Sequence, residues 1–79
     1  MGLSGHRALI TGAGQGIGRA CAEVFAEQGA ELVLLDRNPL TLGEVEDRLR
    51  KAGRKVTAAA VDLTDPADLR RGLEAVRAA

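Results

Sequence analysis

Two kinds of apolar pattern alternate along the chain and predict the element order β-α-β-α-β-α. Short, largely apolar runs at residues 8–11, 32–35 and 56–61 are typical of buried strands that are covered on both faces. After each run, apolar residues recur at helical spacing, which predicts an amphipathic helix. The residues expected to face inward are Ile17, Ala20, Cys21, Val24 and Phe25 in the first helix, Leu42, Val45, Leu49 and Ala52 in the second, and Leu69, Leu73 and Val76 in the third.

Helix-starting and helix-ending residues set the expected boundaries of the three helices. Glycine favours the conformation that ends a helix, an Asn-Pro pair breaks the chain, and the side-chain oxygens of Asp accept hydrogen bonds from first-turn amides. Proline fits the first helical position. The first helix should end near Gln28. The expected boundary residues are Gly29 after the first helix, Asn38, Pro39 and Gly53 around the second, and Asp65, Pro66 and Asp68 at the start of the third.

The second helix also has a charged face with oppositely charged residues at i,i+4 spacing. Such pairs stabilise an exposed helix by about 0.2–0.5 kcal/mol each, and we expect no other role for them. The expected pairs are Glu44–Arg48, Glu46–Arg50 and Asp47–Lys51.

Short loops between alternating strands and helices predict a parallel sheet with right-handed crossovers. In a doubly wound sheet of this kind, the first two helices lie on one face, so only the third is left to cover the other. We therefore expect part of one sheet face and the free edge of the first strand to be uncovered. The sequence thus predicts an incomplete α/β domain that could self-associate or bind a partner chain there.

Composition excludes several functions. The eleven basic and eleven acidic residues give no net charge, so the chain is not expected to bind nucleic acid or an anionic membrane. No segment approaches the roughly 18 apolar residues needed to cross a bilayer. The single Cys21 cannot form an internal disulfide, which favours a cytoplasmic location. Cys21 and the isolated His6 are expected to be structural, and no metal site is predicted.

A glycine-rich segment, Thr11-Gly12-Ala13-Gly14-Gln15-Gly16-Ile17-Gly18, joins the first strand to the first helix. Glycines let a phosphate approach the backbone, and the free amides of the helix N-terminus favour negative charge. The spacing does not match G-x-G-x-x-G or the Walker A motif. The segment therefore predicts a nucleotide-binding loop of another type.

The pattern Thr-Gly-x-x-x-Gly-x-Gly in this segment resembles the cofactor motif of the short-chain dehydrogenase/reductase family. The resemblance implies that residues 1–79 form the N-terminal part of an NAD(P)-binding Rossmann domain, a doubly wound parallel sheet. It also implies hydride transfer between a nicotinamide cofactor and an alcohol or carbonyl substrate. The loop residues expected to contact the dinucleotide are Gly12, Gly14, Gln15, Gly16, Ile17 and Gly18.

Acids at the ends of the second and third strands extend this predicted site. A carboxylate at Asp36 can accept hydrogen bonds from both hydroxyls of the adenosine ribose and would repel the 2′-phosphate of NADP, so NAD is the expected cofactor. The neighbouring Arg37 could partly neutralise that phosphate. In the family pattern, Asp62 and the amide of Leu63 would contact adenine. The alternatives are that Asp36 caps the following loop and that Asp62 starts the third helix.

The catalytic groups of the family have no counterpart here. The family uses a Tyr-x-x-x-Lys pair, a serine and an asparagine, whereas this chain has no tyrosine, Ser4 precedes the first strand and Asn38 lies in a loop. We assign no catalytic residue and expect the chain by itself to be inactive. Two alternatives are a non-catalytic nucleotide-binding module that a partner completes, and a fragment of an S-adenosylmethionine-dependent methyltransferase, because Gly12, Gly14 and Gly16 also fit G-x-G-x-G.

Overall fold

The computed structural model describes residues 2–78, which form three strands and three helices in the predicted alternating order. Each element lies within a few residues of its expected position. The elements are β1 (Arg7–Thr11), α1 (Gly16–Glu27), β2 (Glu31–Asp36), α2 (Pro39–Lys51), β3 (Val56–Ala60) and α3 (Pro66–Ala78).

The three strands form one parallel sheet in the order β1-β2-β3. Ala8 of β1 pairs with Leu32 of β2, which in turn pairs with Val56 of β3. The central strand β2 is buried on both faces, because Leu32 and Leu34 face one layer of helices while Val33 and Leu35 face the other. The predicted partial Rossmann arrangement is therefore confirmed.

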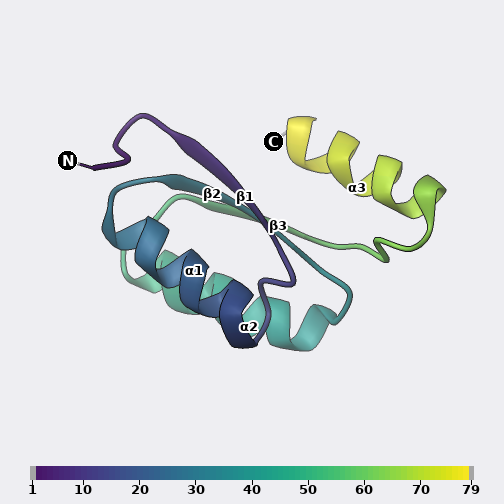
Figure 1. The fold of residues 1–79 in the computed structure, drawn as a ribbon, viewed down its shortest axis with the longest axis horizontal. Helices are drawn as coiled ribbons and strands as arrows, with labels where there is room; N and C mark the ends of the chain where they lie inside the picture. Colours follow the sequence, from purple (N-terminus) through teal and green to yellow (C-terminus); the bar gives the residue numbers. More distant parts are fainter. Residues whose placement is uncertain (1, 79) are drawn as a thin grey trace.

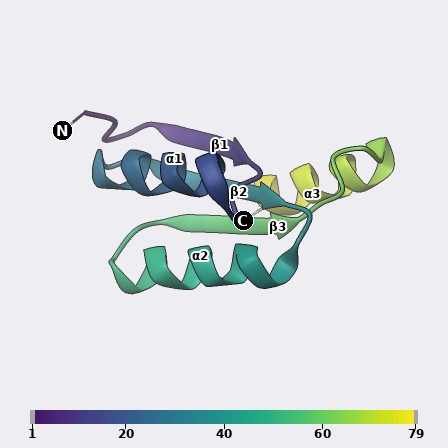
Figure 2. The ribbon, with the colours of Figure 1, turned by 60° about the horizontal axis from the view of Figure 1, so that its bottom comes forward.

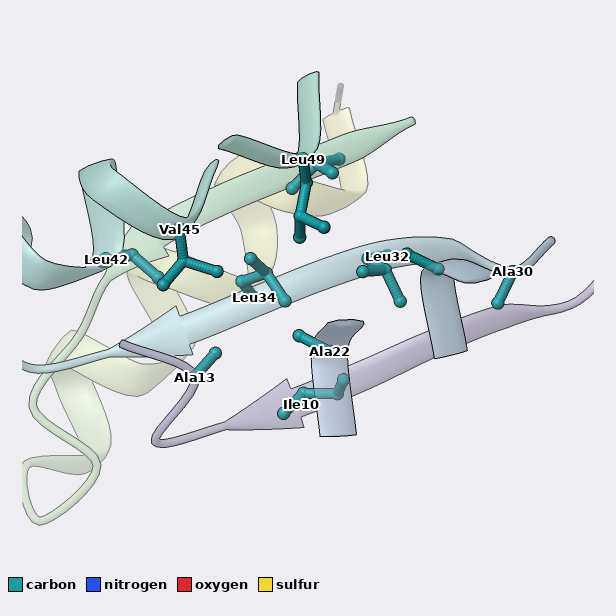
Figure 3. Close-up of a cluster of buried hydrophobic side chains, with 11 residues drawn as sticks. Ile10, Ala13, Ala22, Ala30, Leu32, Leu34, Leu42, Val45 and Leu49 are labelled. Atoms are coloured by element: carbon teal, nitrogen blue, oxygen red, sulfur yellow. The ribbon is translucent and has the colours of Figure 1, made fainter. Parts of the chain in front are cut away.

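Helices α1 and α2 lie on one side of the sheet and α3 lies on the other (Figure 1). Helix α1 packs on β1 and β2, while α2 runs along β3, as Figure 2 shows. The core between this pair of helices and the sheet is the larger of two clusters (Figure 3). Its buried side chains include Ile10, Ala22, Ala26, Leu32, Leu34, Leu42, Val45 and Leu49, whereas the cluster under α3 contains Val33, Leu35, Val61 and Val76.

The predicted inward face of α1 is wrong. Ile17 is 84% exposed and Val24 is 52% exposed, whereas Ala22 and Ala26 are almost completely buried. The reason is that α1 starts very close to the glycine loop and approaches the sheet through its small residues, which leaves no space for larger side chains underneath. Of the remaining members of the predicted stripe, Cys21 is partly buried and packs against the core as expected, whereas Ala20 and Phe25 lie outside it.

The other two helices follow their predicted faces with one exception each. In α2, Leu42, Val45 and Leu49 are buried and only Ala52, just after the helix, is exposed. In α3, Val76 is buried and Leu69 packs partly against the core, but Leu73 is 39% exposed. Helix α3 contacts Val61 through Gly72, where a Cβ atom would overlap the valine side chain. This close approach turns the neighbouring Leu73 outward.

Predicted charge pairs on α2 are only partly formed. Glu46 and Arg50 make an ion pair at 2.7 Å, as expected. Arg48 instead pairs at 3.0 Å with Glu23 of α1, because the two helices lie side by side on the same sheet face. This contact joins α1 to α2, which the i,i+4 pattern alone does not reveal.

The predicted helix starts are confirmed for α2 and α3. The side-chain Oδ1 of Asn38 accepts hydrogen bonds from the amides of Leu40 at 2.9 Å and Thr41 at 3.4 Å. Asp65 Oδ1 likewise accepts from the Ala67 amide at 3.0 Å, with Pro66 as the first residue of the helix. These bonds fix the residues at which α2 begins after β2 and α3 begins after β3.

The sheet is incompletely covered in the part of the chain that the structure describes. The outer edge of β1 pairs with no other strand there, and Leu9 is 55% exposed.

No helix within residues 2–78 is long and apolar enough to cross a membrane.

A glycine loop and two acids at the strand ends

The glycine loop connects the carboxyl end of β1 to the start of α1. Gly12 and Gly16 have φ values of +63° and +60°, a conformation that residues with a Cβ atom rarely adopt. A Cβ added to either glycine would meet no atom within 4 Å. The loop therefore turns where its backbone is open to solvent rather than covered by side chains.

Gly14 and Gly18 serve a different purpose, because both lie against other parts of the chain. A Cβ at Gly18 would overlap the carbonyl oxygen of Gly12, so the first turn of α1 packs directly on the loop. A Cβ at Gly14 would lie 2.6 Å from Asp36 Oδ2 and 2.6 Å from Thr41 Oγ1. Glycine at these positions permits contacts that link β1, β2 and α2.

Several amides at the start of α1 are free to bind a ligand. Within the described residues, the N–H groups of Gly16, Ile17 and Gly18 donate no hydrogen bond, and the first helical bond runs from Arg19 to the Gln15 carbonyl at 3.3 Å. Gln15, the N-cap residue, has an extended backbone and makes no side-chain capping bond. Unpaired amides and the positive end of the helix dipole favour an anion at this position.

Asp36 points at the glycine loop from the end of β2. Its Oδ2 accepts a hydrogen bond from the Gly14 amide at 2.6 Å, and its Oδ1 accepts one from the Asn38 amide at 3.2 Å. The residue is half-buried. The sequence offered two interpretations of Asp36, as part of the loop site and as a cap of the following turn. The carboxylate contacts both the loop and that turn.

Asp62 and Leu63 follow β3, one strand further along the sheet. Asp62 Oδ1 accepts hydrogen bonds from the amide of Thr64 at 3.0 Å and from its hydroxyl at 2.6 Å, and these bonds hold the pKa of Asp62 below its usual value. The positive charge of Arg37 lowers the same pKa further, which places that side chain near the acid. Leu63 is 42% exposed.

The turn after β3 also serves to start α3. The Asp62 amide donates to Asp68 Oδ2 at 2.7 Å, and this bond, followed by the one from Arg71, lowers the pKa of Asp68. Arg71 additionally donates to the Ala60 carbonyl at 3.0 Å. The backbone amide of Asp62 is therefore bonded to α3, but its carboxylate is bonded to Thr64 and the helix is capped by Asp65. The second carboxylate oxygen of Asp62 makes no hydrogen bond within residues 2–78.

The structure brings the loop and Asp36 into direct contact, and it places Arg37, Asp62 and Leu63 beside them at the same sheet edge. Sequence reasoning missed Thr41, whose hydroxyl lies next to Gly14. It treated Asn38 mainly as a chain break, although Asn followed by Pro is a recognisable helix start. No sequence signal indicates the approach of Thr41, because it depends on how α2 packs.

Hollows also lie at the opposite, amino-terminal edge of the sheet. Two pockets of about 510 and 630 Å³ share Arg7, Glu31, Arg54 and Lys55 and contain none of the predicted site residues. They are flanked by the carboxyl ends of α1 and α2, where the helix dipoles are negative. The negative ends of these helices explain the basic side chains in the two pockets without a ligand. We therefore place the candidate site at the glycine loop.

Comparison with known proteins agrees with this geometry. The family model for short chain dehydrogenases matches residues 6–79. The chain belongs to this family. Oxidoreductase UcpA of Escherichia coli K12 is 46% identical to this chain over 67 residues, which cover 85% of the chain and 25% of UcpA. The chain spans about a quarter of the length of the curated relatives it matches.

Solved structures of the family are also similar to this chain. A short-chain dehydrogenase/reductase from Burkholderia phymatum in complex with NAD is 39% identical with a TM-score of 0.88, and the match covers 95% of this chain and 27% of that protein. L-sorbose reductase from Gluconobacter frateurii, complexed with NADPH and L-sorbose, is 40% identical with a TM-score of 0.91, over 99% and 30% of the two chains. The neighbours thus include proteins that bind NAD and proteins that bind NADPH.

Proposed function

We propose that residues 1–79 form the N-terminal part of a Rossmann domain that binds the adenosine diphosphate half of a nicotinamide dinucleotide. The observation that carries the proposal is the contact between Asp36 and the glycine loop beside the free amides of α1. This arrangement offers donors for a diphosphate and an acceptor for a sugar within one small region. The NAD and NADPH complexes of the structural neighbours support it.

In this proposal, each predicted residue has a separate role. The open backbone at Gly12 and Gly16 admits the diphosphate, and the amides of Gly16, Ile17 and Gly18 donate to it. The exposed Gln15 lies beside this approach. The roles of the remaining proposed residues are close packing for Gly14, ribose binding for Asp36 and Arg37, and adenine binding for Asp62 and the Leu63 amide.

We propose that NAD is preferred over NADP. A half-buried carboxylate at Asp36 repels a nearby 2′-phosphate more strongly than a fully solvated one would, because water screens it less. Arg37 reduces this repulsion but lies close enough to Asp62 for the two charges to interact.

The reaction proposed for the whole protein is hydride transfer between a nicotinamide cofactor and an alcohol or carbonyl compound. The cofactor would accept the hydride from an alcohol or donate it to a carbonyl, while these residues would hold and orient its adenosine end. Since the chain has no tyrosine to act as proton donor, we expect it to bind dinucleotide without catalysing the reaction by itself.

Calorimetric titration of the folded chain with NAD, NADP and S-adenosylmethionine tests the proposal. We expect binding of NAD, weaker binding of NADP and none of S-adenosylmethionine. Asp36→Ala should weaken NAD binding, whereas Glu44→Gln, which removes an exposed acid of α2, should leave it unchanged. Binding of S-adenosylmethionine alone would overturn the function, and tighter binding of NADP would reverse the proposed preference.

We further propose a cytoplasmic location and association through the uncovered part of the sheet. The location is supported by the single cysteine. Association is supported by the free edge of β1 and by the exposed Leu9 beside it. Sedimentation at several concentrations should show a second copy binding, and a monomer at all concentrations would count against self-association.

A further inference from the structure

We infer that Asp36 is a positioning residue of the glycine loop, in addition to the ribose contact proposed above. The expected effect of this role on ligand binding rests on the proposed function, whereas the positioning of the loop by Asp36 does not. Asp36 accepts two backbone hydrogen bonds, one from Gly14 in the loop and one from Asn38 at the start of the next turn. One carboxylate thus joins segments that are separated by β2 and α1.

The bond to Gly14 has the features of a structural restraint. Its N···O distance of 2.6 Å is at the short end for an amide bonded to a carboxylate, and the bond is partly buried. The absence of a side chain at Gly14 allows the approach, because a Cβ there would lie 2.6 Å from the same oxygen. The loop is otherwise joined to β2 by the longer bond from the Ala13 amide to the Leu35 carbonyl at 3.2 Å.

The bond to Asn38 continues the connection into α2. Asn38 caps that helix by accepting from the Leu40 amide at 2.9 Å, and its own amide donates to Asp36. The hydroxyl of Thr41 lies on the same side of Gly14 as Asp36, because both oxygens would be 2.6 Å from an added Cβ there. The loop therefore packs against Asp36 and the first turn of α2 together, and removal of the carboxylate removes one of these two contacts.

This second role changes what substitution of Asp36 should do to ligand binding. An ionised carboxylate has about four acceptor positions, so two backbone bonds leave room for ribose hydroxyls. If Asp36 acted through the ribose alone, its removal would affect only ligands that carry those hydroxyls and would relieve the repulsion of NADP. If it also positions the loop, its removal weakens every ligand that binds the loop amides, including NADP.

The structural part is tested on the chain without ligand. In ¹⁵N-labelled protein, we expect the Gly14 amide proton to be shifted downfield and protected from exchange. Asp36→Ala should remove both features, with exchange at least about tenfold faster, which corresponds to about 1.4 kcal/mol. Asp36→Asn, which keeps one acceptor oxygen, should restore part of the protection. The control Glu44→Gln should change nothing, and an unaltered Gly14 amide in Asp36→Ala would overturn the inference.

The ligand-binding part compares NAD with an analogue that lacks both hydroxyls of the adenosine ribose. Asp36→Ala should lower the affinity for the analogue at least about fivefold, and NADP affinity should fall as well. Unchanged analogue affinity in Asp36→Ala would show that Asp36 acts through the ribose alone. Failure of the wild-type chain to bind any dinucleotide would overturn the proposed function, while the amide measurements would still decide whether Asp36 positions the loop.

Discussion

Gly14 and Gly18 are required by neighbouring atoms, whereas Gly12 and Gly16 are required by their own backbone angles. The difference matters because a substitution fails for a different reason in each pair. Positive φ strains any residue that has a Cβ atom, even in open space. Close packing instead penalises the added volume, since the backbone carbonyl of Gly12 cannot move away from Gly18 without changing the loop.

Gly18→Ala should therefore destabilise the protein by about 1–3 kcal/mol, the usual range for an overpacked site. The matched control is Gly43→Ala in α2, where an added Cβ meets no atom within 4 Å and φ is not positive. That variant should be stabilising by about 0.5–1 kcal/mol, because alanine favours a helix over glycine. Urea unfolding of both variants measures the difference. Equal effects would contradict the packing of α1 on the loop.

The pKa of Asp62 provides a second test of a single residue. Thr64→Val removes the hydroxyl that is the largest cause of its lowered pKa, so the pKa should rise toward the ordinary value of 3.8. Because the pKa is lower in the folded state, the contribution of Asp62 to stability is present above the unfolded pKa and is lost as the pH falls through the folded one. Carboxyl NMR titration measures the change, and Thr57→Val should leave it unaffected.

At the scale of the element, small residues decide which face of a helix meets the sheet. Helix α1 contacts the sheet through Ala22 and Ala26, although its larger apolar residues form a regular stripe elsewhere. Helix α3 similarly approaches through Gly72 and turns Leu73 outward. Helix α2 has no such close contact, so its largest apolar residues are the buried ones and hydrophobic periodicity predicts it correctly.

The starts of α1 and α2 differ and should respond differently to substitution. Asn38→Ala removes the cap of α2 and should cost about 1 kcal/mol. Gln15→Ala at the corresponding position of α1 removes no capping bond, so stability should change by less than about 0.5 kcal/mol. Thermal unfolding of the two variants checks this. A large loss in Gln15→Ala would mean that its side chain caps α1 in solution.

At the scale of the whole molecule, burial is concentrated around β2. The central strand is covered on both faces, whereas β1 has helix α1 on one face and the exposed Leu9 on the other. A domain of this size has only about 3–5 kcal/mol available from a single core. The stability of the chain should therefore depend on a few residues of β2 and the helices next to them.

Two leucine-to-alanine substitutions test this distribution. Leu34→Ala in the completely buried part of β2 should cost about 2–5 kcal/mol. Leu9→Ala should cost less than about 1 kcal/mol, because more than half of that side chain is already in water. Urea titration, with a stabilising osmolyte for Leu34→Ala, measures both changes. Both titrations are made at a concentration at which sedimentation shows a monomer, and a large cost at Leu9 under these conditions would contradict the exposure of its side chain.

The order of elements, the parallel sheet, both ends of α2, the start of α3 and the position of the glycine loop could be predicted from the sequence. These features depend on local signals: apolar runs, capping residues and glycines, each of which acts within a few residues of its own position. The proposal that this segment is a nucleotide loop also rests on local spacing, since the amides that would face a phosphate belong to one continuous turn.

Three features could not be predicted without the packing of the elements. They are the buried faces of α1 and α3, the ion-pair partner of Arg48 and the contact of Asp36 with Gly14. Each of these depends on the distance between elements that are far apart in the sequence. That distance is set by the glycines and alanines at their contacts, and the absence of a side chain gives no signal in a pattern of apolar residues. The same small residues that sequence periodicity overlooks are therefore those that bring β1, β2 and the helices into the arrangement of the site.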